Sequence, residues 1–402
     1  MDERPLTPRS DGFGHNKKNQ DPLLFKKYFS KYRTIKKIGE GSFGKVYKAE
    51  YEGEYYAVKF EDRNKGQNLL EAEATIMSYL KGPNIPVIKS FGYSGDYNIL
   101  VMQLLGKSLE DLFNKLQKFS VKTSALLIYQ MISILQYIHD RHIIHRDIKP
   151  DNFVMGLNKK NAILYLLDFG LAKKYRSSRT LVQYPYIKKK KLTGTARYAS
   201  IHALEEMEQS RRDDMESVGY VIMYFLRGNL PWQGLKIKSK EDKYKKILDK
   251  KKETSSKDLC MNFPDEFREY VEYTRNLDYE EEPKYEKFRN KFYNLICKKR
   301  GESFDYIYDW TTESDIKKRE IPHNEDTEFK ATATKDAEIR SKIKEKEKII
   351  DVNNTNNNNL NPMRVSNNLN NINQPSIKEE DIMKMEENHI VTDKVDSRCC
   401  IM

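Results

Sequence analysis

HRDIKPDN, residues 145–152, is the most informative stretch of this sequence. Its residues suit the transfer of a phosphate to a hydroxyl group. Asp147 can accept the hydroxyl proton, Lys149 can neutralise the transferred phosphate, and Asn152 can bind magnesium. Asp168-Phe169-Gly170 follows after an apolar stretch and offers a second magnesium carboxylate. Chance recurrence of this octet in this order is very rare, so a purely structural role is disfavoured.

A glycine-rich stretch, IGEGSFGKV, lies upstream at residues 38–46. Gly39, Gly41 and Gly44 permit a tight turn whose backbone amides can approach a phosphate. Such a motif alone is weak evidence, because a glycine-rich hairpin has the same composition. Here it precedes a strand that carries Lys59, and a lysine in a buried strand needs an anionic partner. The combination favours a nucleotide site.

The segment NLLEAEATIMSYL, residues 68–80, predicts a helix with two acidic residues. Either Glu71 or Glu73 can pair with Lys59. The alternative is an ordinary amphipathic helix, and it holds for whichever glutamate faces solvent.

Composition narrows the class of protein. The chain has 402 residues, a formal charge of +12 and four cysteines without the spacing of a disulfide framework or a zinc site. The charge favours anionic partners. No run of 18 apolar residues and no N-terminal apolar segment is present, so we expect neither a membrane span nor secretion, and a reducing, intracellular compartment.

The amino-acid composition changes twice along the chain. Residues 1–28 are polar and are expected to form a flexible segment, and residues 313–402 are expected to form a charged, Asn-rich flexible tail. Between them, residues 55–60 and 97–104 predict buried strands, and residues 124–140 predict a buried helix. We therefore expect an α+β fold with two lobes: an antiparallel-sheet N-lobe at about 29–104 and a mainly helical C-lobe at about 105–312.

With these motifs in this order, the chain resembles a eukaryotic protein kinase and, more narrowly, the casein kinase 1 family. Ser200-Ile201-His202 stands where most protein kinases have Ala-Pro-Glu and where that family has Ser-Ile-Asn. Three further segments are similar to the corresponding segments of that family: LTGTARYASI, EQSRRDDMES and LPWQGLK. The resemblance covers about residues 29–312. His202 departs from the family pattern, outside the nucleotide site, and bears on local packing of its segment.

The resemblance implies a serine/threonine kinase that uses ATP and Mg²⁺. Asp147 would be the catalytic base, Lys149 would assist it, Lys59 would contact the nucleotide and pair with Glu73, and the metal ligands would be Asn152 and Asp168. The residues implied around the nucleotide are Ile38, Gly39, Glu40, Gly41, Ser42, Phe43, Gly44, Val46, Ala57, Lys59, Met102, Gln103, Leu105, Val154, Leu167 and Asp168. Thr195 and Asp214 would hold the catalytic loop, and Phe153 and Phe169 would pack in the core.

The resemblance also implies two sites for substrate anions near KKKKLTGTAR, residues 188–197. Arg197, Gly234 and Lys243 match the first site, and Arg146, Lys173 and Lys190 match the second. The implied substrate is a Ser/Thr three residues after a phosphorylated Ser/Thr, or one among acidic residues. Some of the four consecutive lysines would be merely solvated.

The last residues, CCIM, fit a C-a-a-X motif and predict farnesylation of Cys399, with palmitoylation of the cysteine pair as the alternative. One lipid gives marginal membrane binding, so we expect a cytoplasmic monomer with a membrane-associated pool, and a nuclear pool stays open. Two rival functions are a kinase-fold scaffold without catalysis and a nucleic-acid-binding protein. The complete set of motif residues disfavours the first, and no recognition motif supports the second.

Overall fold

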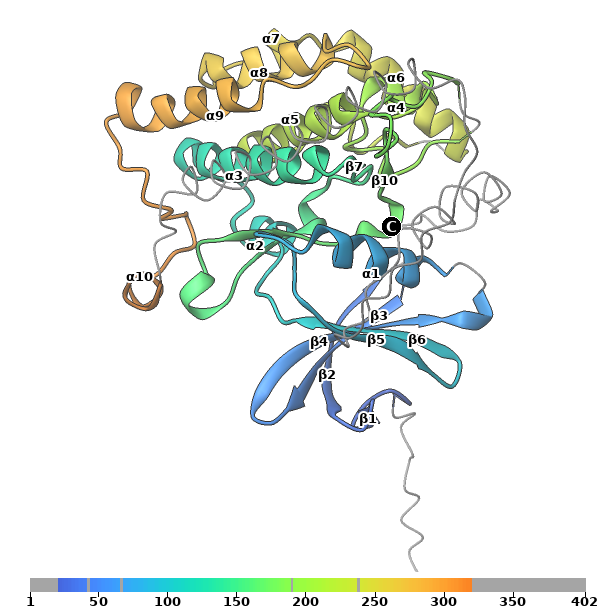
Figure 1. Ribbon diagram of the computed structural model, residues 1–402. Helices are drawn as coiled ribbons and strands as arrows, with labels where there is room; N and C mark the ends of the chain where they lie inside the picture. Colours follow the sequence, from blue (N-terminus) through green and yellow to red (C-terminus); the bar gives the residue numbers. More distant parts are fainter. Residues whose placement is uncertain (1–20, 42–43, 66–67, 189–190, 237–238, 320–402) are drawn as a thin grey trace, which may run out of the picture. The chain divides into compact units, whose positions relative to one another are not determined.

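The computed structural model describes residues 21–41, 44–65, 68–188, 191–236 and 239–319 (Figure 1). The chain divides into two compact units. The first unit is Met1–Leu105 with Leu167–Lys173, and the second is Gly106–Leu166 with Lys174–Met402. Leu167–Lys173 is an addition to the first unit that the sequence analysis did not foresee.

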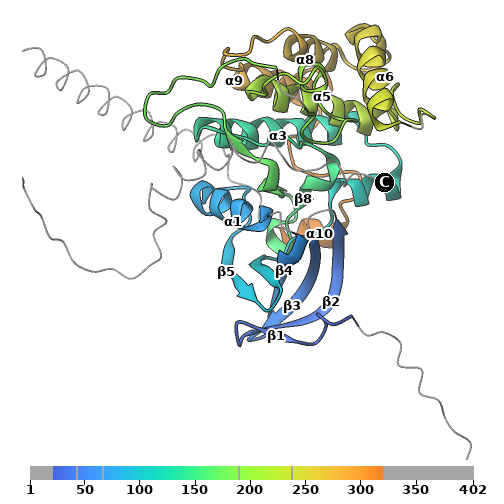
Figure 2. The same ribbon diagram turned by 90° about the vertical axis from the view of Figure 1, so that its right-hand side faces the viewer.

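The described part of the first unit is built on one antiparallel sheet with the strand order β1-β2-β3-β4-β6-β5 (Figure 2). The strands are β1 (Lys27–Tyr28), β2 (Tyr32–Gly41), β3 (Gly44–Tyr51), β4 (Glu54–Asp62), β5 (Ile88–Ser94) and β6 (Tyr97–Gln103). The unit also holds η1 (Arg63–Lys65), α1 (Leu69–Leu80) and η4 (Phe169–Leu171). Alternating apolar residues in β3 and β4 bury one face of the sheet, as period-two patterning requires.

The core on this face includes residues that the sequence analysis assigned to a flexible segment. Leu23 and Tyr28 are buried in one cluster with Tyr47, Phe60 and Val101. The Tyr47 hydroxyl donates to Asp21 at 2.5 Å. The expected flexible segment up to residue 28 therefore needs correction for residues 21–28, because apolar side chains inside a polar stretch find a partner surface on the sheet.

The described part of the second unit is mainly helical, and two long helices form its centre. Helices α3 (Val121–Asp140) and α5 (Arg211–Arg227) contact each other, and α9 (Tyr285–Asn294) and α8 (Asp265–Arg275) pack against α3 and α5, respectively (Figure 1). Almost every side chain of α3 and α5 is buried. A helix that is buried on nearly all sides lies inside a domain, so these two helices are the frame against which the loops of the unit pack.

The remaining elements of this unit are short. They are α2 (Leu109–Leu116), β7 (Ile143–Ile144), η2 (Pro150–Asn152), β8 (Phe153–Met155), η3 (Asn158–Lys160), β9 (Leu164–Leu166), α4 (Ile201–Leu204), α6 (Lys240–Glu253), α7 (Ser256–Leu259), the π-helical turn η5 (Leu295–Lys299) and α10 (Glu313–Lys318); β10 (Lys173–Lys174) lies at the division between the units. The sheet-rich first unit and the helical second unit confirm the predicted α+β fold with two lobes. Phe153 and Phe169 are buried, as expected.

Helix α10 lies beyond residue 312, where the sequence analysis placed the start of the flexible tail. A capping box of Thr312 and Asp315 begins the helix, and the Asn161 amide donates to the Asp315 backbone oxygen at 3.3 Å. The Arg319 guanidinium donates to the Tyr306 carbonyl at 3.0 Å. The expected boundary therefore needs correction up to residue 319, because local capping and these two contacts hold the segment. None of the helices in the described ranges has the length and apolar character needed to cross a membrane.

Candidate active site

The glycine-rich stretch forms the end of the β2–β3 hairpin in the first unit. Gly39 pairs with Val46, and Val46 pairs with Lys59 on the next strand. Gly44 has a φ of +134°, and a Cβ there would lie 2.0 Å from the Phe60 carbonyl oxygen. Only glycine fits that position. The register therefore places Lys59 in one cross-strand row with the glycine hairpin, whose tip residues Ser42 and Phe43 lie outside the described residues.

Lys59 is the centre of a buried ion-pair cluster. Its Nζ lies 2.6 Å from Glu73 Oε2 and 3.2 Å from Asp168 Oδ1. Burial alone lowers the pKa of a lysine, but the charges of Asp168 and Glu73 outweigh burial and raise the pKa of Lys59. The lysine is therefore a fixed positive charge between two carboxylates. Glu71 is exposed, so Glu73 is the partner.

A buried carboxylate on β4 fixes the start of the helix that carries Glu73. Glu61 Oε1 accepts hydrogen bonds from the backbone N–H groups of Leu69 and Leu70 at 2.8 and 3.2 Å. It does so in place of Asn68, which precedes the helix in a left-handed conformation and gives no side-chain cap. A carboxylate at a helix N-terminus satisfies unpaired donors and complements the helix dipole. Lys59 and the helix cap thus lie two residues apart on one strand.

The other residues implied around the nucleotide have these positions. Ala57 pairs with Met102 across β4 and β6, and both are buried. The backbone N–H of Gln103 donates to the Val87 carbonyl at 2.8 Å, so it is used within the sheet. Ile38 is exposed. Glu40 lies in β2, Leu105 and Leu167 bound the first unit, and Val154 lies in β8 of the second unit.

Three side chains of the second unit converge on Asp147, which is 4% exposed. Asp147 Oδ1 accepts hydrogen bonds from the Thr195 backbone N–H at 2.9 Å and from the Thr195 hydroxyl at 2.7 Å. Lys149 Nζ lies 2.6 Å from Asp147 Oδ2. The Asn152 amide donates to the Asp147 backbone oxygen at 2.9 Å. Cationic and neutral donors therefore orient both carboxylate oxygens, as a proton acceptor requires.

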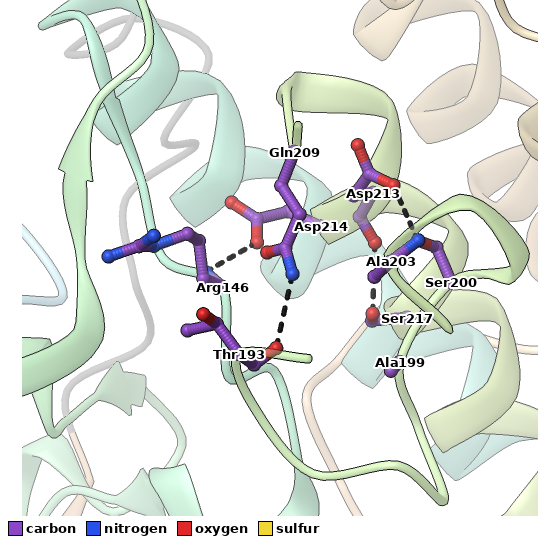
Figure 3. Close-up of a pocket in the computed structure, with 9 residues that line it drawn as sticks. All are labelled: Arg146, Thr193, Ala199, Ser200, Ala203, Gln209, Asp213, Asp214 and Ser217. Carbon is purple, nitrogen blue, oxygen red and sulfur yellow. Dashed lines mark hydrogen bonds between the residues drawn. The ribbon is translucent and has the colours of Figure 1, made fainter. Parts of the chain in front are cut away.

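Asp214 on α5 anchors the backbone of this loop (Figure 3). Its carboxylate accepts from the N–H of His145 at 2.7 Å and of Arg146 at 2.9 Å, and it lies 3.0 Å from His139 Nε2. Arg146 has a φ of +68°, a conformation that costs a non-glycine residue free energy. Burial raises the pKa of Asp214, but the hydrogen bond and charge of His139 lower it by a larger amount. The net pKa of Asp214 is therefore below its ordinary value.

Gly194 brings the Thr193–Thr195 turn against the catalytic loop. It has a φ of +98°, and a Cβ there would lie 2.3 Å from the Arg146 carbonyl oxygen. Any side chain would push the turn away from the loop and would break both contacts of Thr195 with Asp147. The family resemblance implies a role for Thr195, but no sequence pattern reveals the steric demand at Gly194.

The two side chains implied as metal ligands each carry an oxygen donor of the kind that magnesium prefers. The Asn152 amide nitrogen donates to the Asp147 backbone oxygen within the catalytic loop. This hydrogen bond orients the amide group. Asp168 is held at Lys59 with a φ of +64°. Mg²⁺ is commonly bound by one or two such side chains together with phosphate oxygens and water. No cluster of three or more His, Cys, Asp or Glu side chains suited to a metal occurs in the described ranges.

The residues implied for the first anion site lie in the second unit. The Trp232 indole N–H donates to the Arg197 carbonyl at 2.8 Å, which ties Arg197 to the segment of Gly234. The Arg197 guanidinium lies 5.7 and 5.8 Å from the ring centroids of Tyr198 and Tyr224, with no carboxylate ion pair among the described residues. Lys243 is exposed on α6.

The residues implied for the second anion site do not all belong to one unit of the chain. Arg146 lies in the second unit and Lys173 in the first, and Lys190 lies outside the described residues. Cys399 also lies outside them. His202 Nδ1 lies 3.3 Å from Glu205 Oε2 and 3.4 Å from the Tyr186 hydroxyl.

A family model described as "Protein kinase domain" matches residues 32–305, which is most of the chain. The chain belongs to this family. It is a protein kinase, a transferase with the bilobal α+β kinase fold, and protein kinases use ATP and Mg²⁺.

Proposed function

We propose that this chain is an ATP- and Mg²⁺-dependent serine/threonine protein kinase of casein kinase 1 type. The observation that carries this proposal is the arrangement around Asp147. One buried carboxylate is oriented by Thr195 and Lys149, and the loop is anchored by Asp214. In the same chain, Lys59 carries a fixed positive charge beside Glu73 and Asp168.

These residues divide the work of phosphoryl transfer. The substrate hydroxyl oxygen forms a bond to the γ-phosphorus of ATP while the bond between that phosphorus and ADP breaks, and Asp147 accepts the hydroxyl proton. Lys149 balances negative charge next to Asp147, and Lys59 binds phosphate oxygens of the nucleotide. Asn152 and Asp168 would hold Mg²⁺, which neutralises charge on the phosphates when bound. Positioning and charge, rather than covalent chemistry, supply the catalysis.

We further propose that the substrates carry a phosphorylated or acidic residue upstream of the target Ser/Thr. Arg197 supports this part, because an arginine that forms no ion pair with a carboxylate of the described residues, seated beside two tyrosines, suits a phosphate or carboxylate. Gly234 and Lys243 would complete that site. Arg146, Lys173 and Lys190 are proposed as a second one.

Phosphate transfer to two matched peptides tests the proposal. One peptide carries phosphoserine three residues before the target serine, and the other carries serine there. We expect wild type to have a kcat/KM at least tenfold higher for the primed peptide, and an Arg197→Ala, Lys243→Ala double variant to lose most of this ratio. Asp147→Asn should abolish transfer to both. Equal losses on both peptides in the double variant would contradict the substrate preference, and residual full activity of Asp147→Asn would contradict the catalytic assignment.

A lipid on Cys399 is proposed as a membrane anchor, with a cytoplasmic and a membrane-associated pool of a monomeric enzyme. The motif at Cys399 supports it, and the net basic charge of the chain adds attraction to anionic lipid. Fractionation of Cys399→Ser beside wild type, with mass determination of the C-terminal peptide, tests it. A wild-type membrane fraction equal to that of Cys399→Ser would rule the anchor out, and the mass distinguishes a prenyl group from palmitate.

A further inference from the structure

Helix α6 carries a fully buried lysine among many exposed ones. Lys251 has no exposed surface, although the helix reads KEDKYKKILDKKKE. Burying an ammonium group is unfavourable unless it finds specific partners. Lys251 Nζ donates to the Ala196 carbonyl at 3.1 Å and to the Ala199 carbonyl. It also lies 4.5 Å and 5.1 Å from the ring centroids of Tyr220 and Trp232.

The two carbonyls that Lys251 binds flank Arg197. The carbonyl of Arg197 itself accepts from the Trp232 indole at 2.8 Å. Buried donors therefore hold the backbone oxygens on both sides of Arg197 and at Arg197, while the residue as a whole stays exposed. These hydrogen bonds fix the backbone from which the Arg197 side chain projects. The guanidinium group takes no part in them.

Helix α5 and the residue Gln209 just before it hold the two ends of the same segment. The Gln209 amide, just before this helix, donates to the Thr193 carbonyl at 3.1 Å, and Ser200 donates to Asp213, around the small pocket drawn in Figure 3. The Ile201 N–H donates to Glu216 at 2.9 Å. Between these two ends, Lys251 and Trp232 bind the carbonyls of Ala196, Arg197 and Ala199.

Helix α6 links this support to the second residue of the proposed anion site. Lys243 and Lys251 are eight residues apart on one helix, roughly 12 Å along its axis at the usual rise per residue. The exposed end thus carries Lys243 and the buried end holds the backbone around Arg197. A shift of α6 moves both.

We propose that Lys251 is a positioning residue that, with Trp232, fixes the backbone around Arg197 and thereby sets the recognition of an anionic residue in the substrate. This inference rests on the proposed role of Arg197 in substrate recognition. Lys251 touches no substrate atom in this role and acts through the Ala196 and Ala199 carbonyls.

The test compares KM and kcat of Lys251→Met on the primed and unprimed peptides. Methionine fills a similar volume and cannot donate to the carbonyls. We expect the KM for the primed peptide to rise about tenfold, while the KM for ATP and the kcat on the unprimed peptide change less than twofold. A purely structural loss would lower the active fraction and reduce kcat equally on both peptides. Lys252→Met is the matched control, because that neighbour pairs with Glu205 and its side chain is 50% exposed.

Trp232→Phe provides a second variant in case Lys251→Met fails to fold, since phenylalanine keeps an aromatic ring and lacks the N–H for Arg197. It should raise the primed-peptide KM in the same direction. If Arg197→Ala removes the primed preference and neither Lys251→Met nor Trp232→Phe alters it, the inference is wrong and the proposed function stands. If wild type shows no primed preference, or Arg197→Ala leaves it intact, the proposed function itself fails, and the inference with it.

Discussion

Thr195 donates two hydrogen bonds to one oxygen of Asp147, from its backbone N–H at 2.9 Å and from its hydroxyl at 2.7 Å. The other oxygen, Asp147 Oδ2, lies 2.6 Å from Lys149 Nζ. A threonine from one loop therefore fixes the rotation of the carboxylate that the proposed mechanism uses as a base, and Gly194 allows the turn to approach closely enough to do so.

Thr195→Val tests this contact, because valine keeps the shape and loses the hydroxyl. A hydrogen bond to a charged group contributes about 1.5–3 kcal/mol, so we expect kcat to fall by roughly 10- to 100-fold. The KM for ATP should stay within twofold. Thr195→Ser should recover most of the rate, and steady-state kinetics measures all three quantities. A Val variant with wild-type kcat would show that the backbone N–H alone orients Asp147.

Lys59→Met separates the catalytic and structural contributions of the buried cluster. The variant leaves Glu73, whose side chain is 3% exposed, without its cation. Removing one partner of a buried pair typically costs about 3–5 kcal/mol, so we expect a clear drop in the free energy of unfolding and loss of nearly all phosphate transfer. Adding Glu73→Gln should restore much of the stability and none of the activity. Urea unfolding and a phosphorylation assay measure the two effects, and unchanged stability in Lys59→Met would contradict the buried pair.

The sequence predicted the nucleotide and catalytic motifs because short local patterns define them. Helix periodicity could also have decided between Glu71 and Glu73. Leu70, Glu73 and Met77 follow the three-then-four spacing of one helix face, and that face is the buried one. Glu71 lies off this face and is exposed.

Contacts between distant segments were the part that sequence patterns could not supply. Lys251 occurs in a lysine-rich helix that predicts a solvated face, and only Ile247, one turn earlier and also buried, hints that its face is covered. Leu23 and Tyr28 are isolated apolar residues in a polar stretch, and their partner surface forms only when the sheet does. In both cases tertiary packing overrides the local composition.

Asp214→Asn should loosen the catalytic loop and change the pH dependence of stability. The carboxylate holds the N–H groups of His145 and Arg146, and we expect a loss of about 2–3 kcal/mol at neutral pH, as for hydrogen bonds to a buried charge. Because the pKa of Asp214 is lowered in the fold, its stabilisation is present above its ordinary value of 3.8 and is lost as the pH falls further. The stability advantage of wild type over the variant should therefore shrink in urea unfolding as the pH falls below 3.8. A difference that stays constant from pH 7 to pH 3 would contradict an ionised Asp214.

Lys251 gives a pH dependence of the same sign in a higher pH range. Burial lowers its pKa to about 7, with Glu216 raising it and Arg275 lowering it, while the Tyr220 hydroxyl donates to Glu216 within the same cluster. Above pH 7 the folded chain holds this lysine neutral, whereas the unfolded chain keeps it protonated up to its ordinary pKa of 10.5. Since the unfolded state then binds more protons, the contribution of Lys251 to stability rises with pH, by at most about 1.4 kcal/mol per pH unit.

The measurement is the free energy of unfolding of wild type and Lys251→Met between pH 6.5 and 9.5. We expect the difference between wild type and variant to be flat below pH 7 and to move in favour of wild type above it. A neutral amine still has two N–H groups for the Ala196 and Ala199 carbonyls, so the positioning contact survives the loss of the charge. Lys252→Met should show no such change, because its lysine is half exposed beside Glu205. A flat difference for Lys251→Met across the whole range would mean that Lys251 stays charged in the fold, held by its carbonyl and ring partners.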